Sequence, residues 1–348
     1  MKYSGIGGQA VIEGVMMKGK SRYAVSVRKP DGQIEVKVED YKSLKEKYAI
    51  AKLPIIRGIF AFAESLKMGM GTLNYSASFW EEEEEKEKES SKDNSKENQK
   101  TNDLWMGLAL VAAIIVAIGL FVLLPFFISE KLYKIVPSIQ LRGLIEGVIR
   151  VALFVGYVKA ISLLEDIRRV FMYHGAEHKC INCIENGMEL TVENAKKQTM
   201  VHKRCGTSFM LVVMFVSILL FMFISVPNMW VRMVLRILLI PVIAGISFEF
   251  ISLAGKSENP VINVLSKPGL WLQALTTREP DDSMLEVAIS SVEAVFDWRD
   301  FLAHYEDEEE QPEEEGFEVV DVEDENDEIL QALDRYFDEA APTEEKEQ

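Results

Sequence analysis

Cysteine and histidine are scarce in this sequence. Its 348 residues include three cysteines and four histidines. Three cysteines cannot form a paired disulfide framework, which excludes a small secreted scaffold held together by disulfides. No apolar run follows the opening "MKYSGIGGQA", so we expect no secretory signal peptide and thiols that stay reduced in the cytosol.

Positive charge is scarce toward the C-terminus. Residues 306–348 contain 21 acidic and 2 basic side chains, so the first 305 residues carry about +2 of the total charge of −17. This composition predicts a disordered acidic tail. Within the tail, residues 327–337 place four apolar side chains on one helical stripe, which we interpret as a docking segment for a soluble or membrane protein partner. No nucleic-acid partner is predicted.

Long apolar runs are abundant instead. Hydrophobic residues make up 48% of the chain and charged residues 27%, so the two kinds must occupy different segments. Residues 104–128 and 207–226 contain no charged side chain and are long enough to cross a bilayer as helices. Residues 142–164 and 229–254 are similar but contain charges. The predicted fold class is a mainly α, polytopic membrane protein with about four transmembrane helices in the lipid bilayer.

The distribution of Lys and Arg predicts how these helices are oriented. Residues 165–206 include seven such side chains, residues 129–141 include two, and the turn at 227–228 has none. Short loops rich in Lys and Arg stay in the cytosol. We therefore predict a multi-pass protein of the cytoplasmic membrane with both termini in the cytosol.

The other segments are more polar. Apolar and polar residues alternate on both sides of Pro30-Asp31-Gly32, which predicts a β-hairpin. Residues 53–73 are predicted to form a helix lying in the membrane interface. The predicted domains are residues 1–80 with the hairpin and interfacial helix, a disordered charged linker at 81–103, the four-helix membrane domain at 104–254, a cytosolic amphipathic helical region at 255–305, and the tail at 306–348.

One short stretch concentrates the rare residues. The sequence "YHGAEHKCINCIENG" at 173–187 contains His174, Glu177 and His178 in an H-x-x-E-H pattern. On a helix the two histidines share one face, and Glu177 lies about 60° around the axis from His174. Cys180 and Cys183 point largely away from that face, so we interpret them as small, half-buried thiols.

Three further side chains are expected near the same membrane surface. His202 and Cys205 immediately precede the second charge-free run, and Glu249 lies near the cytosolic end of the last span. Glu249 is the weaker ligand candidate, because Lys159 lies at equal depth in its own span and an intramembrane ion pair is an alternative. The predicted metal ligands are therefore His174, His178, His202 and Cys205.

The H-x-x-E-H pattern leaves three interpretations open. In inverted zinc proteases, the two histidines of this pattern bind Zn²⁺ and the glutamate activates water. The residues here fit a catalytic divalent-metal site with Glu177 as the base, a bound metal without chemistry, or histidines held by hydrogen bonds alone. Zn²⁺ is the favoured ion.

Further charged residues fall within the predicted spans. Arg142, Glu146 and Arg150 lie along one side of the second span, and Arg232 and Arg236 lie along one side of the fourth. Ionisable side chains at such depth should face one another or a water-filled cavity. We interpret them as a structural charge network, while the excess of arginine leaves a lipid-headgroup or solute site open.

Four blocks of the sequence resemble one known family. They are "GIGGQAVIEGVMMKG" at 5–19, "YHGAEHKCIN" at 173–182, "ELTVENAKKQ" at 189–198 and "HKRCGTSF" at 202–209. In these blocks the chain resembles the YqhQ-like bacterial integral membrane proteins, a domain of unknown function described as a predicted metal-dependent enzyme. The resemblance implies that the positions of interest are His174, Glu177, His178, His202 and Cys205. We expect the first block, with Gln9, Glu13 and Gly14, to pack against them.

Taken together, these features favour a metal-dependent hydrolase with its site at the cytosolic membrane surface and Glu177 as the catalytic base. The first alternative is a non-enzymatic membrane scaffold or biogenesis factor, with a structural metal or histidine site and a tail that docks a partner. The second alternative is a solute or lipid carrier that uses the buried arginines.

Overall fold

The computed structural model describes residues 2–44, 48–89, 107–108, 111–132, 135–136, 138–202, 204–224, 226, 228–254 and 260–309. The chain is mainly helical with one small antiparallel sheet near the N-terminus, as predicted. It divides into two compact units, Met1–Leu302 and Ala303–Gln348, and the site lies in the first. The predicted docking segment 327–337 lies outside the described residues.

The sheet is a meander of four antiparallel strands in chain order. These strands are β1 (Gly7–Val11), β2 (Gly14–Lys18), β3 (Arg22–Arg28) and β4 (Ile34–Asp40). The predicted hairpin is β3 and β4, with Gly32 in the turn at a positive φ of 85°. Strands β1 and β2 were not predicted, because "GGQAV" and "GVMMK" do not alternate between apolar and polar residues.

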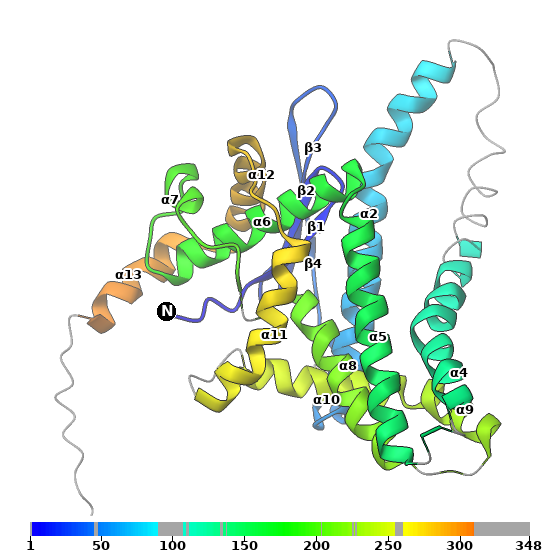
Figure 1. The fold of residues 1–348 in the computed structure, drawn as a ribbon. Helices are drawn as coiled ribbons and strands as arrows, with labels where there is room; N and C mark the ends of the chain where they lie inside the picture. The colour runs from blue at the N-terminus through cyan, green and yellow to red at the C-terminus, as the bar shows by residue number, and fades with distance from the viewer. Residues whose placement is uncertain are drawn as a thin grey trace, which may run out of the picture. The chain divides into compact units, whose positions relative to one another are not determined.

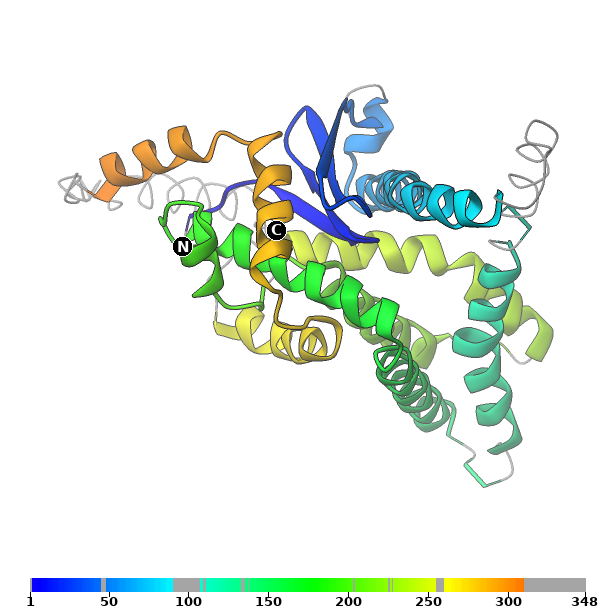
Figure 2. The ribbon, with the colours of Figure 1, turned by 90° about the horizontal axis from the view of Figure 1, so that it is seen from above.

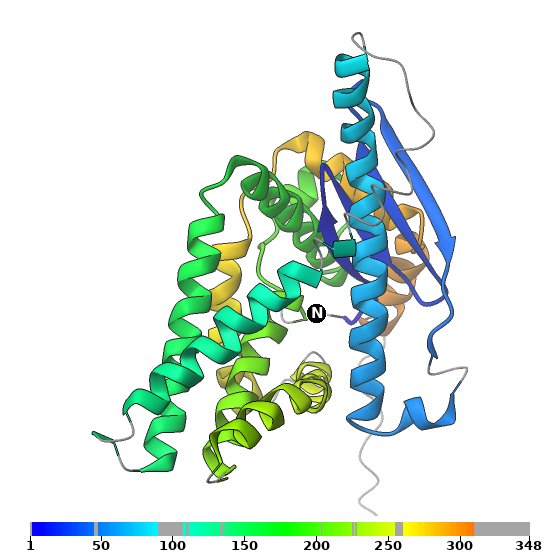
Figure 3. The ribbon, with the colours of Figure 1, turned by 90° about the vertical axis from the view of Figure 1, so that its right-hand side faces the viewer.

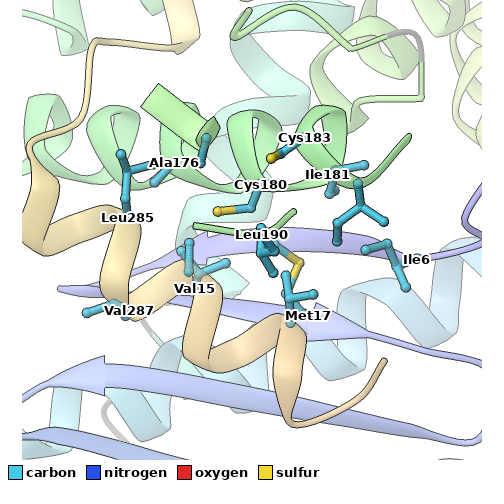
Figure 4. Packing of buried hydrophobic residues seen from close by; sticks show 14 of the residues in the cluster. Ile6, Val15, Met17, Ala176, Cys180, Ile181, Cys183, Leu190, Leu285 and Val287 are labelled. Atoms are coloured by element: carbon cyan, nitrogen blue, oxygen red, sulfur yellow. The ribbon is translucent and has the colours of Figure 1, made fainter. Parts of the chain in front are cut away.

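Helices cover both faces of this sheet. Successive side chains of a strand point to opposite faces. Val15 and Met17 of β2 therefore pack against α6 (Glu165–Glu185) and α12 (Asp282–Glu293), as Figure 4 shows. Met16 packs on the other side against α2 (Ile56–Glu89). Figure 2 shows the sheet between α12 and α2.

Helix α2 is longer than the interfacial helix predicted at 53–73. Its first part packs on α10 (Ile240–Ala254), where a Cβ atom on Gly58 would come within 2.7 Å of the carbonyl oxygen of Gly245. Its later part runs beside the sheet (Figure 3). Helix α2 continues through residues 81–89 of the predicted linker, which are rich in the strong helix formers Glu and Lys. The remainder of that linker lies outside the described residues.

The described residues contain two helices long and apolar enough to cross a membrane, Val111–Lys131 and Gly206–Phe223. The first includes the π-helical turn η2 (Gly119–Leu123) and α4 (Leu124–Lys131), and the second is α8. Two bent helix pairs raise the number of candidate spans to four if each pair is one span.

Helix α5 (Ile139–Ile161) is continuous and overlaps the span predicted at 142–164, whereas the span predicted at 229–254 is broken. The chain bends by 101° between α5 and α6, so the two helices meet at a corner in Figure 1. The last predicted span breaks into α9 (Met229–Leu238) and α10, which are bent by 45°. Pro241 accounts for this break, since proline has no N–H for the helix ladder and its ring clashes with the preceding turn.

Three helices follow the last candidate span, in the region predicted to be helical. They are α11 (Pro260–Thr276), α12 and α13 (Trp298–Glu309). Helix α12 packs its apolar side chains into the core. Its Ser291 hydroxyl donates to the carbonyl oxygens of Val15 and Ala24 at 3.0 and 3.1 Å, which ties α12 to the sheet.

Candidate metal centre

Helix α6 presents the H-x-x-E-H residues on the face expected from their spacing. His174 and His178 are one turn apart, and their ring centroids are separated by 4.4 Å. Cys180 and Cys183 are fully buried in the core between α6, α12 and the sheet. This placement agrees with the prediction that these two cysteines point away from the histidine pair.

Cys205 reaches the histidines from the N-terminus of α8. Its Sγ lies 3.2 Å from Nε2 of His174, and the three possible ligand atoms of His174, His178 and Cys205 all lie within 4.8 Å of one another. Cys205 is the N-cap of α8, where its sulfur accepts from the backbone N–H of Thr207 at 3.4 Å. The thiolate is the form of a cysteine side chain that binds metal.

Backbone carbonyls fix how the two imidazoles are turned. Nδ1 of His174 lies 2.8 Å from the carbonyl oxygen of Thr276, and Nδ1 of His178 lies 2.6 Å from that of Met200. A carbonyl oxygen can only accept, so both Nδ1 atoms carry hydrogen, and the neutral form of each ring has its lone pair on Nε2. Histidines that bind metal are commonly oriented in this way. Neither carbonyl could be identified from a side-chain pattern.

Gly175 makes the contact between His174 and Thr276 possible. A Cβ atom at this position would overlap the carbonyl oxygen of Arg278. The chain after α11 therefore lies directly on α6, where the N–H of Arg278 donates to the carbonyl oxygen of Phe171 at 2.9 Å. The glycine in "YHGAEH" lets the backbone come close enough to orient the first histidine.

Glu177 lies beside β1, where its side chain is shielded from solvent. Within the described residues its Oε2 has no hydrogen-bond partner. Burial raises the pKa of Glu177 to about 7, against the opposing effects of His174 and of a hydrogen bond from the backbone of Gly8. A Cβ atom on Gly8 would lie 2.9 Å from Cδ of Glu177, so only glycine leaves room here.

His202 lies beside the three converging residues without joining them. Its ring centroid is 5.7 Å from that of His178, but Nε2 faces Oε2 of Glu185 at 3.4 Å. Burial alone would raise the pKa of Glu185, yet hydrogen bonds from His202 and Ser4 and the charge of Arg204 bring it down to about 2. His202 thus belongs to a buried polar network around Glu185 that the sequence analysis did not anticipate.

Glu249 is remote from this group. Both of its carboxylate oxygens accept from Arg57 on α2, and the N–H of Ile55 donates to Oε1 at 3.2 Å. The partner expected from membrane depth was Lys159, and the structure places Arg57 there instead, because α2 packs on α10. Glu249 therefore forms an ion pair outside the candidate metal centre.

The N-terminal block of the sequence packs against the site. Glu13, in the tight turn between β1 and β2 with a φ of 50°, forms an ion pair with Arg169 of α6 and accepts from Tyr173 at 3.3 Å. The amide of Gln9 lies against Gly69 of α2. Strand β1 lies on α6 with Gly8 against Glu177, as expected for this block, whereas Gly14 packs against Ser26 of β3 and does not contact the site.

A cavity of about 520 Å³ opens onto these residues. Its walls are mostly apolar and include Met16 of β2, Met68 of α2 and Phe171 of α6. The functional side chains that line it are His174, Glu177, His178, His202 and Cys205. The structure therefore places three side chains that could hold a metal ion, together with a buried carboxylate, around one cavity.

Comparisons with known proteins agree with the sequence blocks. Residues 53–298 match the family described as "Protein of unknown function (DUF1385)". The chain is 36% identical over 286 residues to "Uncharacterized protein YqhQ" of Bacillus subtilis (strain 168), an alignment covering 82% of this chain and 90% of that protein. No solved structure matches the chain. The protein therefore belongs to the DUF1385 family and is a relative of YqhQ.

Proposed function

We propose that the protein is a metal-dependent hydrolase whose ion is held by His174, His178 and Cys205. The orientation of the two imidazoles carries this proposal, since each binds a backbone carbonyl through Nδ1 and keeps Nε2 for an ion. Two imidazole nitrogens and one thiolate suit Zn²⁺, which catalytic sites hold with three protein ligands and one open position.

The neighbouring carboxylate supports catalysis over a purely structural role. A bound Zn²⁺ would supply a Lewis acid that polarises a substrate carbonyl or phosphoryl group and acidifies water. Glu177 is placed to accept a proton at Oε2, the oxygen without a hydrogen-bond partner among the described residues. The apolar walls of the cavity limit the access of bulk water to that carboxylate.

We further propose that the site lies at the cytosolic surface of the membrane. Helix α6 follows α5 after the bend of 101°, and α8 begins at the residue after Cys205. Cys205 therefore stands at the end of one candidate span, and His174 and His178 lie on the helix that follows the bend after another. The seven Lys and Arg side chains of residues 165–206 favour the cytosolic side.

Metal content and function separate the roles of the side chains. We expect the purified wild-type protein to contain about one zinc ion per chain. His178→Ala and Cys205→Ala should lose this ion, whereas His304→Ala, at the exposed histidine of α13, should retain it. The zinc content of each protein, purified without chelator, is measured by elemental analysis.

Glu177→Gln provides the decisive comparison. It keeps the shape of the side chain and removes only the carboxylate that accepts a proton. We expect this variant to retain zinc and the folded state but to fail to complement deletion of the gene. Full complementation by Glu177→Gln would leave a structural metal site, and wild-type protein without any transition metal would refute both kinds of site.

A further inference from the structure

The arginines predicted inside the candidate spans face acidic partners within the helical bundle. Nη2 of Arg150 on α5 donates to Oε1 of Glu146 at 2.8 Å, and Arg236 on α9 donates to the same oxygen. Arg142 and Arg232 form ion pairs with the two different carboxylate oxygens of Glu130 on α4. The predicted charge network is confirmed, with Glu130 as a partner that the sequence analysis did not include.

Arg150 and Arg236 share a single carboxylate. Only 6% of Arg150 and 8% of Arg236 is exposed, so both guanidinium groups are withdrawn from solvent. Together with Glu146 they leave one uncompensated positive charge. An unpaired charge at this depth in a membrane is expensive, and the ring faces of Phe126 and Phe221, 4.6 and 4.7 Å from Arg236, offset only a part of the cost.

The two arginines differ in how much of their hydrogen-bonding capacity is used. Arg150 also donates to the carbonyl oxygen of Phe121 in η2 at 2.9 Å and to the hydroxyl of Ser217 at 2.8 Å. Within the described part of the chain, Arg236 donates only through Nη1. Its Nε and Nη2 therefore remain for a ligand, and this edge of a guanidinium suits two oxygens of one phosphate or carboxylate.

A cavity lies beside this pair. It has a volume of about 390 Å³ and is bordered by η2, α5, α8 and α10, with Arg150 and Arg236 as its only charged lining residues among those described. Phe154, Val213 and Ile243 are among the apolar residues that make up nearly all of the remaining wall. The cavity thus combines a mostly apolar wall with two positively charged side chains.

We propose that this cavity binds a membrane amphiphile with an acidic headgroup, whose phosphate or carboxylate meets Arg236 and whose hydrocarbon chain lies along the apolar wall. The anion would neutralise the charge left by Glu146, which explains why two arginines share one acid here. Ser217 follows Cys205 by twelve residues of α8, about 18 Å along the helix, so this site is separate from the metal centre. The inference does not depend on the proposed hydrolase.

Thermal unfolding of the full chain in a neutral maltoside detergent tests this proposal. We expect dodecyl phosphate to raise the Tm by at least about 3 °C, because it binds only the folded state. Inorganic phosphate at the same concentration should leave the Tm unchanged, as should dodecanol. A shift with inorganic phosphate alone would overturn the amphiphile and indicate a free-anion site, and no shift with any probe would refute the site.

Substitutions of single arginines identify where dodecyl phosphate binds. Arg236→Gln leaves the Arg150–Glu146 pair neutral, so it should weaken dodecyl phosphate binding roughly tenfold or more while keeping the fold. Arg57→Gln is the matched control, because Arg57 pairs with Glu249 and lies outside the cavity. Equal ligand-induced shifts in both variants would overturn the assignment to Arg236. The wild-type comparison among the three probes remains decisive even where Arg236→Gln does not fold.

Discussion

Gly175 is the residue on which the orientation of the first histidine depends. The backbone of Arg278 occupies the space where a side chain would begin, and Thr276, two residues earlier, accepts from His174. We expect Gly175→Ala to destabilise the protein by roughly 1–3 kcal/mol, as overpacking of a close contact does. It should also weaken zinc binding, because the displaced carbonyl no longer holds the imidazole.

Gly156→Ala is the control for this substitution. Gly156 lies in α5 with nothing near the position of a Cβ atom, and alanine favours a helix over glycine by up to about 1 kcal/mol. The Tm of this variant should be unchanged or slightly higher. If Gly175→Ala unfolds at the wild-type temperature and keeps its zinc, the close approach does not position His174.

The ionisation of Glu185 makes the free energy of unfolding depend on pH in the acidic range. Its pKa falls from the ordinary value of 4.5 to about 2 on folding, so the unfolded state binds the proton more tightly. The stabilisation is therefore fully present above about pH 4.5 and is lost as the pH falls toward 2. The free energy of unfolding of wild-type protein should exceed that of Glu185→Gln at pH 7, and the difference should shrink below pH 4.5. A difference that stays constant down to pH 3 would contradict this network.

Among the elements, α6 lies in residues 165–206, which were predicted only as a cytosolic loop. The face shared by His174 and His178 could still be predicted, because their spacing is a local property of any helix. Strand β2 was missed because it is buried on both faces, so its side chains are apolar without alternation. That burial is created by α2, α6 and α12, which lie far away in the sequence. A pattern within five residues does not contain this information.

In the candidate site, too, features set by nearby sequence could be predicted and contacts between separate segments could not. Cys205 could be placed near the histidines because it precedes a charge-free run that ends at the same membrane surface. The partners of Glu249 and His202 could not be predicted, since Arg57 and Glu185 reach them through helix packing between distant segments. Thr276 and Met200 contribute backbone carbonyls, which every residue possesses.

At the scale of the whole molecule, the orientation in the membrane stays a prediction that surface labelling can test. The three native cysteines are buried, so a single exposed cysteine can be introduced without removing them. We expect Glu193→Cys to react with an impermeant maleimide only in permeabilised cells, because residues 165–206 are predicted to be cytosolic. Gln140→Cys, at the opposite end of α5, should react in intact cells. Reversed labelling of the two positions would place the candidate metal centre outside the cytosol.

The core that joins β2, α6 and α12 also has a consequence for biosynthesis. Ribosomes add about 5–20 residues per second, so the interval between completion of Lys18 and Asp282 is roughly 10 to 50 s. Throughout this time the apolar face of the sheet has no α12 to cover it, while the candidate spans are being made and inserted. The apolar face of the N-terminal sheet must therefore not associate with the candidate spans before α12 leaves the ribosome.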